Sequence, residues 1–434
     1  VYWSDGAQLP PQHAAAIARN MERLDIFNDI QRMDFDDAVR QGLVEFMGAE
    51  TDEAFLSNVL RQPIDPDVVR RVAGRFKIVY TPFHGAGWHL VPEALHRLGM
   101  TQVIPVKEQM VLDGTFPTVK SPNPENPEGF YLAVDLAKEV GSDLILGTDP
   151  DSDRVGVMVR GADGEYHTIT GNQMGVLLLD YIITARRRKG TLPENAAAIS
   201  TIVTSKMVRR ICDVNDIHFD ETFTGFKFMA EKLAEYQRDG SYQYVLAFEE
   251  SYGYMMGDYV RDKDAVTASM MAAEMAAYYY DRGMTLIDAI DELYKKYGFY
   301  SEETVNLFMY GVDGLGYNSE FQGDSIMVQN LGRYHASLVK LLKESGRMPL
   351  HENIWYDGTN EKGKISFDRG LGTHNDDLWG YGDSIKTYLF FNYNWNNTVL
   401  LDRTVEHAQK LGRSPLDLYA GMNMQGGEPK SGER

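Results

Sequence analysis

Short apolar segments alternate with helical patterns from Arg75 onward, and this alternation constrains the fold more than any other feature of the sequence. Strand-like segments occur at residues 77–80, 102–106, 143–146, 198–203 and 244–248. Strands that alternate with helices form mostly parallel, doubly wound sheets, which predicts the α/β class. The loops after the carboxyl ends of such strands share one edge of a sheet, so we expect ligands there.

One of these loops carries three aspartates at alternate positions. The stretch Gly147-Thr-Asp-Pro-Asp-Ser-Asp-Arg154 lies directly between two apolar runs. A turn there would bring Asp149, Asp151 and Asp153 into one small volume, where their mutual repulsion is tolerable when a cation lies among them. We therefore interpret the loop as a divalent-metal site, and a solvated acidic turn is the alternative.

Charge and cysteine content exclude some functions. The formal net charge of −20 argues against nucleic-acid binding, because proteins that bind phosphate backbones carry basic patches. The basic run Arg186–Lys189 ends a helical pattern, and we expect it to interact with the helix dipole and face water. The single cysteine, Cys212, fits a reducing cytoplasm. The sequence has no apolar run of 18 residues, so it predicts no membrane-spanning helix.

Two local motifs predict finer detail. Thr285, with Asp288 three positions later, resembles a capping box, so we expect a helix to begin there and to end at Gly298. His84 lies in the turn at 81–87. It is either a residue at the rim of the site or a turn histidine bonded to backbone.

Five motifs follow one another in the order seen in a known family. They are Tyr80-Thr-Pro-Phe-His-Gly-Ala-Gly87, Ser121-Pro-Asn-Pro-Glu-Asn-Pro-Glu128, Thr148-Asp-Pro-Asp-Ser-Asp-Arg154, Thr224-Gly-Phe-Lys227 and Phe248-Glu-Glu-Ser-Tyr-Gly253. Over about residues 1–308 the chain thereby resembles the α-D-phosphohexomutases, the phosphoglucomutase/phosphomannomutase family. The resemblance implies two doubly wound α/β domains. Residues 73–183 would bind the metal, residues 184–309 the sugar, and residues 1–72 would be the C-terminal remnant of a first domain.

The resemblance also implies a phosphoryl-transfer site. Mg²⁺ would be held by Asp149, Asp151 and Asp153 together with a phosphoserine. The phosphoryl group would move in line between that serine and the two ends of a hexose phosphate, through a hexose bisphosphate intermediate. Arg154 would face the transferring phosphoryl group, and Lys227 would serve phosphate or proton transfer.

The sugar would be bound by the later motifs. The resemblance implies that Glu249 and Ser251 exchange hydrogen bonds with sugar hydroxyls and that Gly225 leaves room for the sugar ring. Glu250 and Lys263 are further candidates near these motifs.

Two parts of the family pattern are not found in this sequence. One is the phosphoserine loop, a Thr-Ala-Ser-His-Asn-Pro type stretch, and the other is the Arg-Pro-Ser-Gly-Thr type loop that clamps the distal phosphate. We therefore expect the isomerase activity to be incomplete in this chain. A catalytically inactive sugar-phosphate-binding module is an alternative.

The last quarter of the chain resembles a different family. Gly311-Val-Asp-Gly-Leu-Gly-Tyr-Asn-Ser-Glu-Phe321, Glu352-Asn-Ile-Trp-Tyr-Asp357 and Asn392-Tyr-Asn-Trp395 are similar to the endo-β-N-acetylglucosaminidases, glycoside hydrolases that use a (β/α)₈ barrel. The resemblance implies that Asn318 positions the 2-acetamido group of an N-glycan core and that Glu320 is general acid and base, in substrate-assisted hydrolysis. Tyr356 and Trp395 would line the sugar subsites.

Residues 310–434 would form only an incomplete (β/α) barrel segment, from the catalytic strand onward. The two resemblances meet at Tyr310-Gly-Val-Asp-Gly314. We therefore expect a chimeric chain, a composite of two truncated parts. An endo-β-N-acetylglucosaminidase is the alternative function from a different enzyme class.

Overall fold

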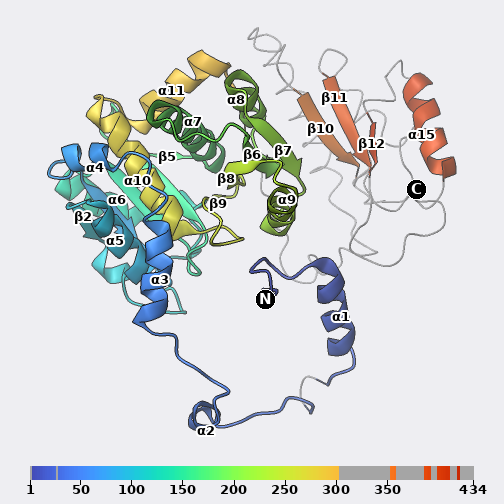
Figure 1. The fold of residues 1–434 in the computed structure, drawn as a ribbon, viewed down its shortest axis with the longest axis horizontal. Helices are drawn as coiled ribbons and strands as arrows, with labels where there is room; N and C mark the ends of the chain where they lie inside the picture. The colour runs from blue at the N-terminus through green and yellow to red at the C-terminus, as the bar shows by residue number, and fades with distance from the viewer. Residues whose placement is uncertain are drawn as a thin grey trace. The chain divides into compact units, whose positions relative to one another are not determined.

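A computed structural model of the 434-residue chain describes residues 2–25, 28–302, 352–357, 386–391, 398–410 and 418–420. The chain divides into two compact units, Val1–Glu303 and Thr304–Arg434 (Figure 1).

The first unit contains a five-stranded sheet in the order β2-β1-β3-β4-β5. β1 pairs in parallel with β2 and β3, whereas β4 is antiparallel to both β3 and β5. The aspartate loop connects β3 to β4 and is too short for a crossover helix, so β4 returns antiparallel. The strands are β1 (Ile78–Thr81), β2 (Val103–Pro105), β3 (Leu144–Thr148), β4 (Val155–Arg160) and β5 (Tyr166–Ile169).

A second sheet of the same unit has the order β7-β6-β8-β9. β6 pairs in parallel with β7 and β8, and β9 is antiparallel to β8. In each sheet three neighbouring strands pair in parallel and one strand runs in the opposite direction, which confirms the predicted α/β class. The strands are β6 (Ala196–Thr201), β7 (His218–Thr222), β8 (Gln243–Phe248) and β9 (Tyr254–Met255).

Helices surround both sheets (Figure 1). The capping box at Thr285 is present: its hydroxyl accepts from the Asp288 amide, and the Asp288 carboxylate accepts from the Thr285 amide. The helices are α1 (Pro11–Met21), α2 (Phe35–Arg40), α3 (Ala49–Val59), α4 (Pro66–Val72), α5 (Gly87–Leu98), η1 (Lys107–Gln109), η2 (Pro127–Phe130), α6 (Tyr131–Val140), α7 (Gly171–Lys189), α8 (Met207–Asn215), α9 (Phe226–Asp239), α10 (Ala265–Asp281) and α11 (Leu286–Tyr297).

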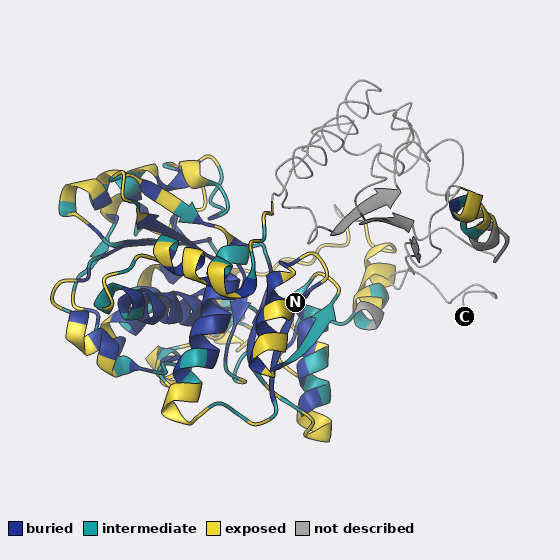
Figure 2. Cartoon of the chain, turned by 90° about the horizontal axis from the view of Figure 1, so that it is seen from above, coloured by how far each residue is buried: buried dark blue, intermediate teal, exposed yellow. Residues whose placement is uncertain are grey.

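Helix α10 lies at the centre of this unit. It is apolar around most of its circumference, as expected of a helix buried on every side, and nearly all of its residues are buried. It contacts α4 and α5 beside the first sheet, and α7 and β9 beside the second. One hydrophobic core therefore joins side chains from both sheets, and buried residues fill the middle of the unit in Figure 2.

A buried carboxylate fixes α10 to the start of α4. Glu274 has no exposed surface, and its carboxylate accepts hydrogen bonds from the amides of Ile64 and Asp65 and from the Tyr181 hydroxyl, at 2.9, 3.1 and 2.7 Å. Burial raises the pKa of Glu274 although these donors act in the opposite direction. The polar groups at the amino end of α4 are thus satisfied from inside the core.

The described part of the second unit is a three-stranded parallel sheet in the order β10-β11-β12. It contains β10 (Glu352–Asp357), β11 (Lys386–Phe391), α15 (Thr398–Lys410) and β12 (Leu418–Ala420). The β11–α15–β12 order is that of one β/α unit. Among the described residues, no helix combines the length and the apolar character needed to cross a membrane.

Candidate functional site

The aspartate loop brings its three carboxylates together at the carboxyl end of β3. One carboxylate oxygen from each of Asp149, Asp151 and Asp153 lies within 4.8 Å of the others. Asp149 is buried, Asp153 is half-buried and Asp151 is exposed. The Asp149 carboxylate also accepts from the amides of Asp153 and Arg154, at 3.0 and 2.9 Å, so this side chain fixes the shape of its own loop.

The electrostatics of this cluster favour a cation. Burial raises the pKa of Asp149 to about 7, and the charges of Asp153 and Asp151 add to the shift. Three converging carboxylates are a hard-oxygen donor set, which suits a divalent cation such as Mg²⁺. The residues present therefore fit a divalent metal ion, as the sequence indicated.

Lys263 is one of two cationic side chains that lie against this cluster, the other being Arg154. Its ammonium group contacts the Asp153 carboxylate and lies 3.6 Å from Asp262, and its side chain is only 11% exposed. Burial lowers the pKa of Lys263, but the hydrogen bond to Asp153 and the charge of Asp262 outweigh that effect, so the net shift is upward. Lys263 therefore stays protonated beside the metal loop.

Arg154 is oriented by a residue that sequence reasoning did not single out. Its Nη1 donates to Oε1 of Glu125 at 2.7 Å, while its Nε lies 3.8 Å from Asp153 and 4.0 Å from Asp149. Glu125 belongs to the Ser-Pro-Asn-Pro-Glu motif, whose position in the family pattern was the available signal. The guanidinium thus lies over the metal loop with one terminal nitrogen held.

Backbone hydrogen bonds connect the metal loop to the loop that follows β8. The Val155 amide donates to the Tyr252 carbonyl at 3.1 Å, and Arg154 and Gly253 form an antiparallel bridge. The Ala265 amide, close to Lys263 in sequence, donates to the Ser152 carbonyl at 3.0 Å. The predicted metal-binding and sugar-binding loops are therefore adjacent.

Glu249 begins this second loop. It is 5% exposed and its Oε1 accepts from the Gly225 amide at 2.5 Å. Burial raises the pKa of Glu249, while Lys263 and Arg154 are close enough to act in the opposite direction. Ser251 is half-buried on the same loop.

The Thr-Gly-Phe-Lys motif precedes α9. Gly225 has φ +116, a conformation that L side chains rarely adopt, which explains why glycine stands there. The Lys227 ammonium lies 4.9 Å from the centre of the Phe228 ring. The structure therefore brings Gly225 to Glu249 and leaves Lys227 against its own helix.

The residues predicted for a glycosidase site fall mostly outside the described residues. Asn318, Glu320 and Trp395 lie outside them. Tyr356 lies on β10, where its backbone is in parallel register with Phe390 of β11.

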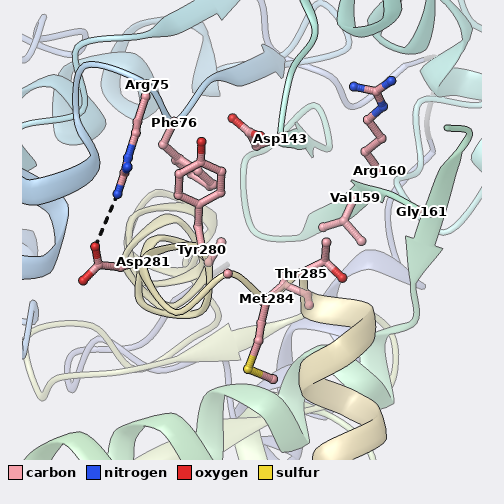
Figure 3. Close-up of a pocket in the computed structure, with 13 residues that line it drawn as sticks. Arg75, Phe76, Asp143, Val159, Arg160, Gly161, Tyr280, Asp281, Met284 and Thr285 are labelled. Carbon is pink, nitrogen blue, oxygen red and sulfur yellow. Dashed lines mark ion pairs between the residues drawn. The ribbon is translucent and has the colours of Figure 1, made fainter.

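A cavity of about 550 Å³ lies at the opposite end of the strands (Figure 3). Phe76, Val159 and Tyr280 contribute to its wall, and Arg75 at its side is paired with Asp281 at 3.5 Å. None of the predicted site residues that the structure describes lines it. This cavity is therefore separate from the aspartate loop.

Comparison with known proteins yields three family matches. Residues 53–164 match phosphoglucomutase/phosphomannomutase, alpha/beta/alpha domain II, and residues 170–297 match alpha/beta/alpha domain III of the same family. Residues 306–434 match glycosyl hydrolase family 85. Both predicted resemblances are thus confirmed.

Curated relatives of this chain include phosphoglucomutases. A phosphoglucomutase of Staphylococcus haemolyticus strain JCSC1435 is 30% identical over 314 residues, covering 72% of this chain and 55% of the relative. A phosphoglucomutase of Staphylococcus aureus strain MSSA476 is 32% identical over 319 residues, covering 73% and 54%. The chain therefore spans about half the length of the curated relatives it matches. Among solved structures, a candidate phosphomannomutase from Thermus thermophilus is 21% identical, with a TM-score of 0.46 over 57% of this chain and 51% of the other.

Proposed function

Through residues 53–297 this chain belongs to the phosphoglucomutase/phosphomannomutase family, and we propose that it binds Mg²⁺ and a hexose phosphate for phosphoryl transfer between the two ends of the sugar. A hexose bisphosphate would be the intermediate. The observation that supports this most is the convergence of three aspartates, Arg154 and Lys263 beside the Glu249 loop. Phosphoryl transfer needs positioning and charge neutralisation more than covalent help, and this arrangement offers both.

The residues would divide the work by their chemistry. Asp149, Asp151 and Asp153 would hold Mg²⁺, which when bound neutralises charge on the transferring phosphoryl oxygens. Arg154, with Nη2 and Nε not engaged by Glu125, would donate to those oxygens.

The remaining residues would bind the sugar and its phosphate. The protonated Lys263 ammonium lies next to the metal loop and would donate a hydrogen bond to the phosphate. Glu249 and Ser251 would bind sugar hydroxyls, Gly225 would leave room for the ring, and Lys227 would approach the phosphate when its side chain turns from Phe228.

Calorimetry with glucose 1,6-bisphosphate in Mg²⁺ tests the proposal. We expect binding that is lost on Asp151→Ala and unchanged on Asp163→Ala, an exposed aspartate in the β4–β5 turn that pairs with His167. Interconversion of glucose 1- and 6-phosphate would establish turnover, whereas binding without turnover would leave a sugar-phosphate-binding module. Bisphosphate binding that is unchanged both without Mg²⁺ and in Asp151→Ala would contradict the proposal.

The match of residues 306–434 to glycosyl hydrolase family 85 favours a second candidate, an endo-β-N-acetylglucosaminidase acting on N-glycan cores. Asn318 and Glu320 would carry it, and Tyr356 and Trp395 would contact sugar. Release of oligosaccharide from a glycopeptide, lost on Glu320→Gln, would support this candidate. Equal release by the variant would exclude Glu320 as its general acid.

A further inference from the structure

His84, in the turn after β1, is hydrogen-bonded through both its backbone and its ring to the segment that follows β2. It is 5% exposed. Its amide donates to the Gln109 carbonyl at 3.0 Å, and its carbonyl accepts from the Asp113 amide at 3.4 Å. Nδ1 lies 2.9 Å from the Val111 carbonyl oxygen and Nε2 lies 2.9 Å from Oγ1 of Thr118. A carbonyl only accepts, so Nδ1 carries a proton, and in the neutral ring Nε2 accepts from the threonine hydroxyl.

These contacts form part of a longer chain of hydrogen bonds. The Phe83 amide donates to the Thr81 hydroxyl at 3.1 Å, which donates to Oε1 of Gln109 at 2.5 Å. Nε2 of Gln109 donates to Thr118 at 3.0 Å, and Thr118 in turn donates to His84. The donors and acceptors along this chain are matched from the Phe83 amide to the Val111 carbonyl, so the ring of His84 has one defined orientation.

The turn held by this network has an unusual backbone. Phe83 and His84 have φ values of +46 and +66, in the left-handed region that residues other than glycine seldom occupy. Such conformations persist where the surrounding structure over-determines them, and they cluster at functional sites. Here the two ring hydrogen bonds of His84 and its two backbone hydrogen bonds, to Gln109 and Asp113, hold the turn.

The same turn rests directly on the metal loop. The Ala86 amide donates to the Pro150 carbonyl at 2.7 Å. A Cβ on Gly85 would lie 2.3 Å from the Cα of Pro150, so the two backbones are as close as a glycine permits. Pro150 stands between Asp149 and Asp151. The position of the turn therefore sets the backbone between two of the three carboxylates.

We propose that His84 is a positioning residue of the metal loop, one that holds Asp149, Asp151 and Asp153 together through the contact of its turn with Pro150. The inference rests on the metal site of the proposed function. Like carboxylates repel one another when no cation is present, so a preformed site needs an external support. Groups that orient metal ligands without touching the metal typically change metal affinity about 10- to 100-fold.

Mn²⁺ titration of the full chain, followed by electron paramagnetic resonance, tests the proposal. We expect the Kd of the site that Asp151→Ala abolishes to rise about tenfold or more in His84→Ala. Asn215→Ala is the matched control, because Asn215 is also a buried polar residue with several hydrogen bonds, to Arg187, Ile211 and Tyr297. It should lower the unfolding midpoint in urea and leave the Kd within about twofold.

Thr118→Val keeps the volume of the side chain and removes the hydroxyl that donates to Nε2. It tests the role of His84 even if His84→Ala does not fold. We expect a Kd about threefold to tenfold higher than that of the natural chain. A Kd within about twofold of the natural value in the folded variants, or an equal loss in Asn215→Ala, would overturn the role of His84. A natural chain whose Mn²⁺ binding is insensitive to Asp151→Ala would instead overturn the metal site itself.

Discussion

Replacement of Glu274 by alanine should be among the most destabilising single changes in the first unit. The variant leaves the amides of Ile64 and Asp65 and the hydroxyl of Tyr181 without their acceptor. Asp65 and Tyr181 are buried at 6% and 1% exposure, so water does not replace the lost partner. Two of these donors, those of Asp65 and Tyr181, belong to buried residues. At about 1–3 kcal/mol for each buried unsatisfied donor, the free energy of unfolding should fall by about 2–6 kcal/mol.

The conservative variant Glu274→Gln should lose less stability, and its loss should depend on pH. In Glu274→Gln one carboxylate oxygen is replaced by an NH₂ group, which cannot accept a hydrogen bond, while the other oxygen remains. The free energy of unfolding should therefore fall by less than in Glu274→Ala, by about 1–2 kcal/mol. Because burial raises the pKa of Glu274, the folded state holds that proton more tightly than the unfolded state. The stabilisation from this group is complete below the ordinary pKa of 4.5 and is lost as pH rises through the raised value. The stability difference between the natural chain and Glu274→Gln should therefore shrink as pH rises above 4.5.

Urea unfolding measured at several pH values checks both expectations. Glu292→Ala is the control, because Glu292 pairs with Lys295 on the exposed side of α11 and its side chain is 58% exposed. It should cause no measurable change. A Glu274→Ala variant within about 1 kcal/mol of the natural chain would refute the reasoning, since that is no more than an average substitution.

Three further changes have defined outcomes. Gly85→Ala places a methyl group against the Pro150 backbone and should raise the Mn²⁺ Kd about tenfold, while Gly114→Ala, with nothing within 4 Å of its added carbon, should leave it unchanged in the same titration. Gly225→Ala forces a side chain into φ +116 and should weaken glucose 1,6-bisphosphate binding in calorimetry about tenfold; equal binding would separate this loop from the sugar. Glu125→Gln releases Nη1 of Arg154 from a half-exposed ion pair, so the urea midpoint should hardly move while bisphosphate binding weakens severalfold.

Local signals in the sequence predicted local structure well. The apolar runs around the aspartate loop became β3 and β4, and the Thr285 capping box begins α11 as expected. Each of these features depends on residues within a few positions of one another, whose spacing alone encodes the geometry. The close approach of the three aspartates follows in the same way from their alternate positions on one turn.

Contacts between distant segments were not predictable from spacing. The basic run at the end of α7 is exposed from Arg187 to Lys189, as expected, but Arg187 also donates to Asn215 at 2.8 Å and Lys189 lies 3.0 Å from Asp65. These two partners, which come from α8 and from the residue before α4, were not predicted. The pairing of Glu125 with Arg154 was missed for the same reason, since a side chain's partner across a fold leaves no periodic signal.

The path of helix α10 has a consequence for how this protein can be divided. By sequence α10 belongs to the segment matched as domain III, yet its sides pack on α4 and α5, which lie in the segment matched as domain II. A fragment ending near residue 164 would expose the apolar surfaces of α4 and α5, and one starting near residue 170 would expose the matching side of α10. The boundary between the two matched segments, near residues 164–170, is therefore not a boundary between independently folding units. We expect both segments to unfold together in a single cooperative transition.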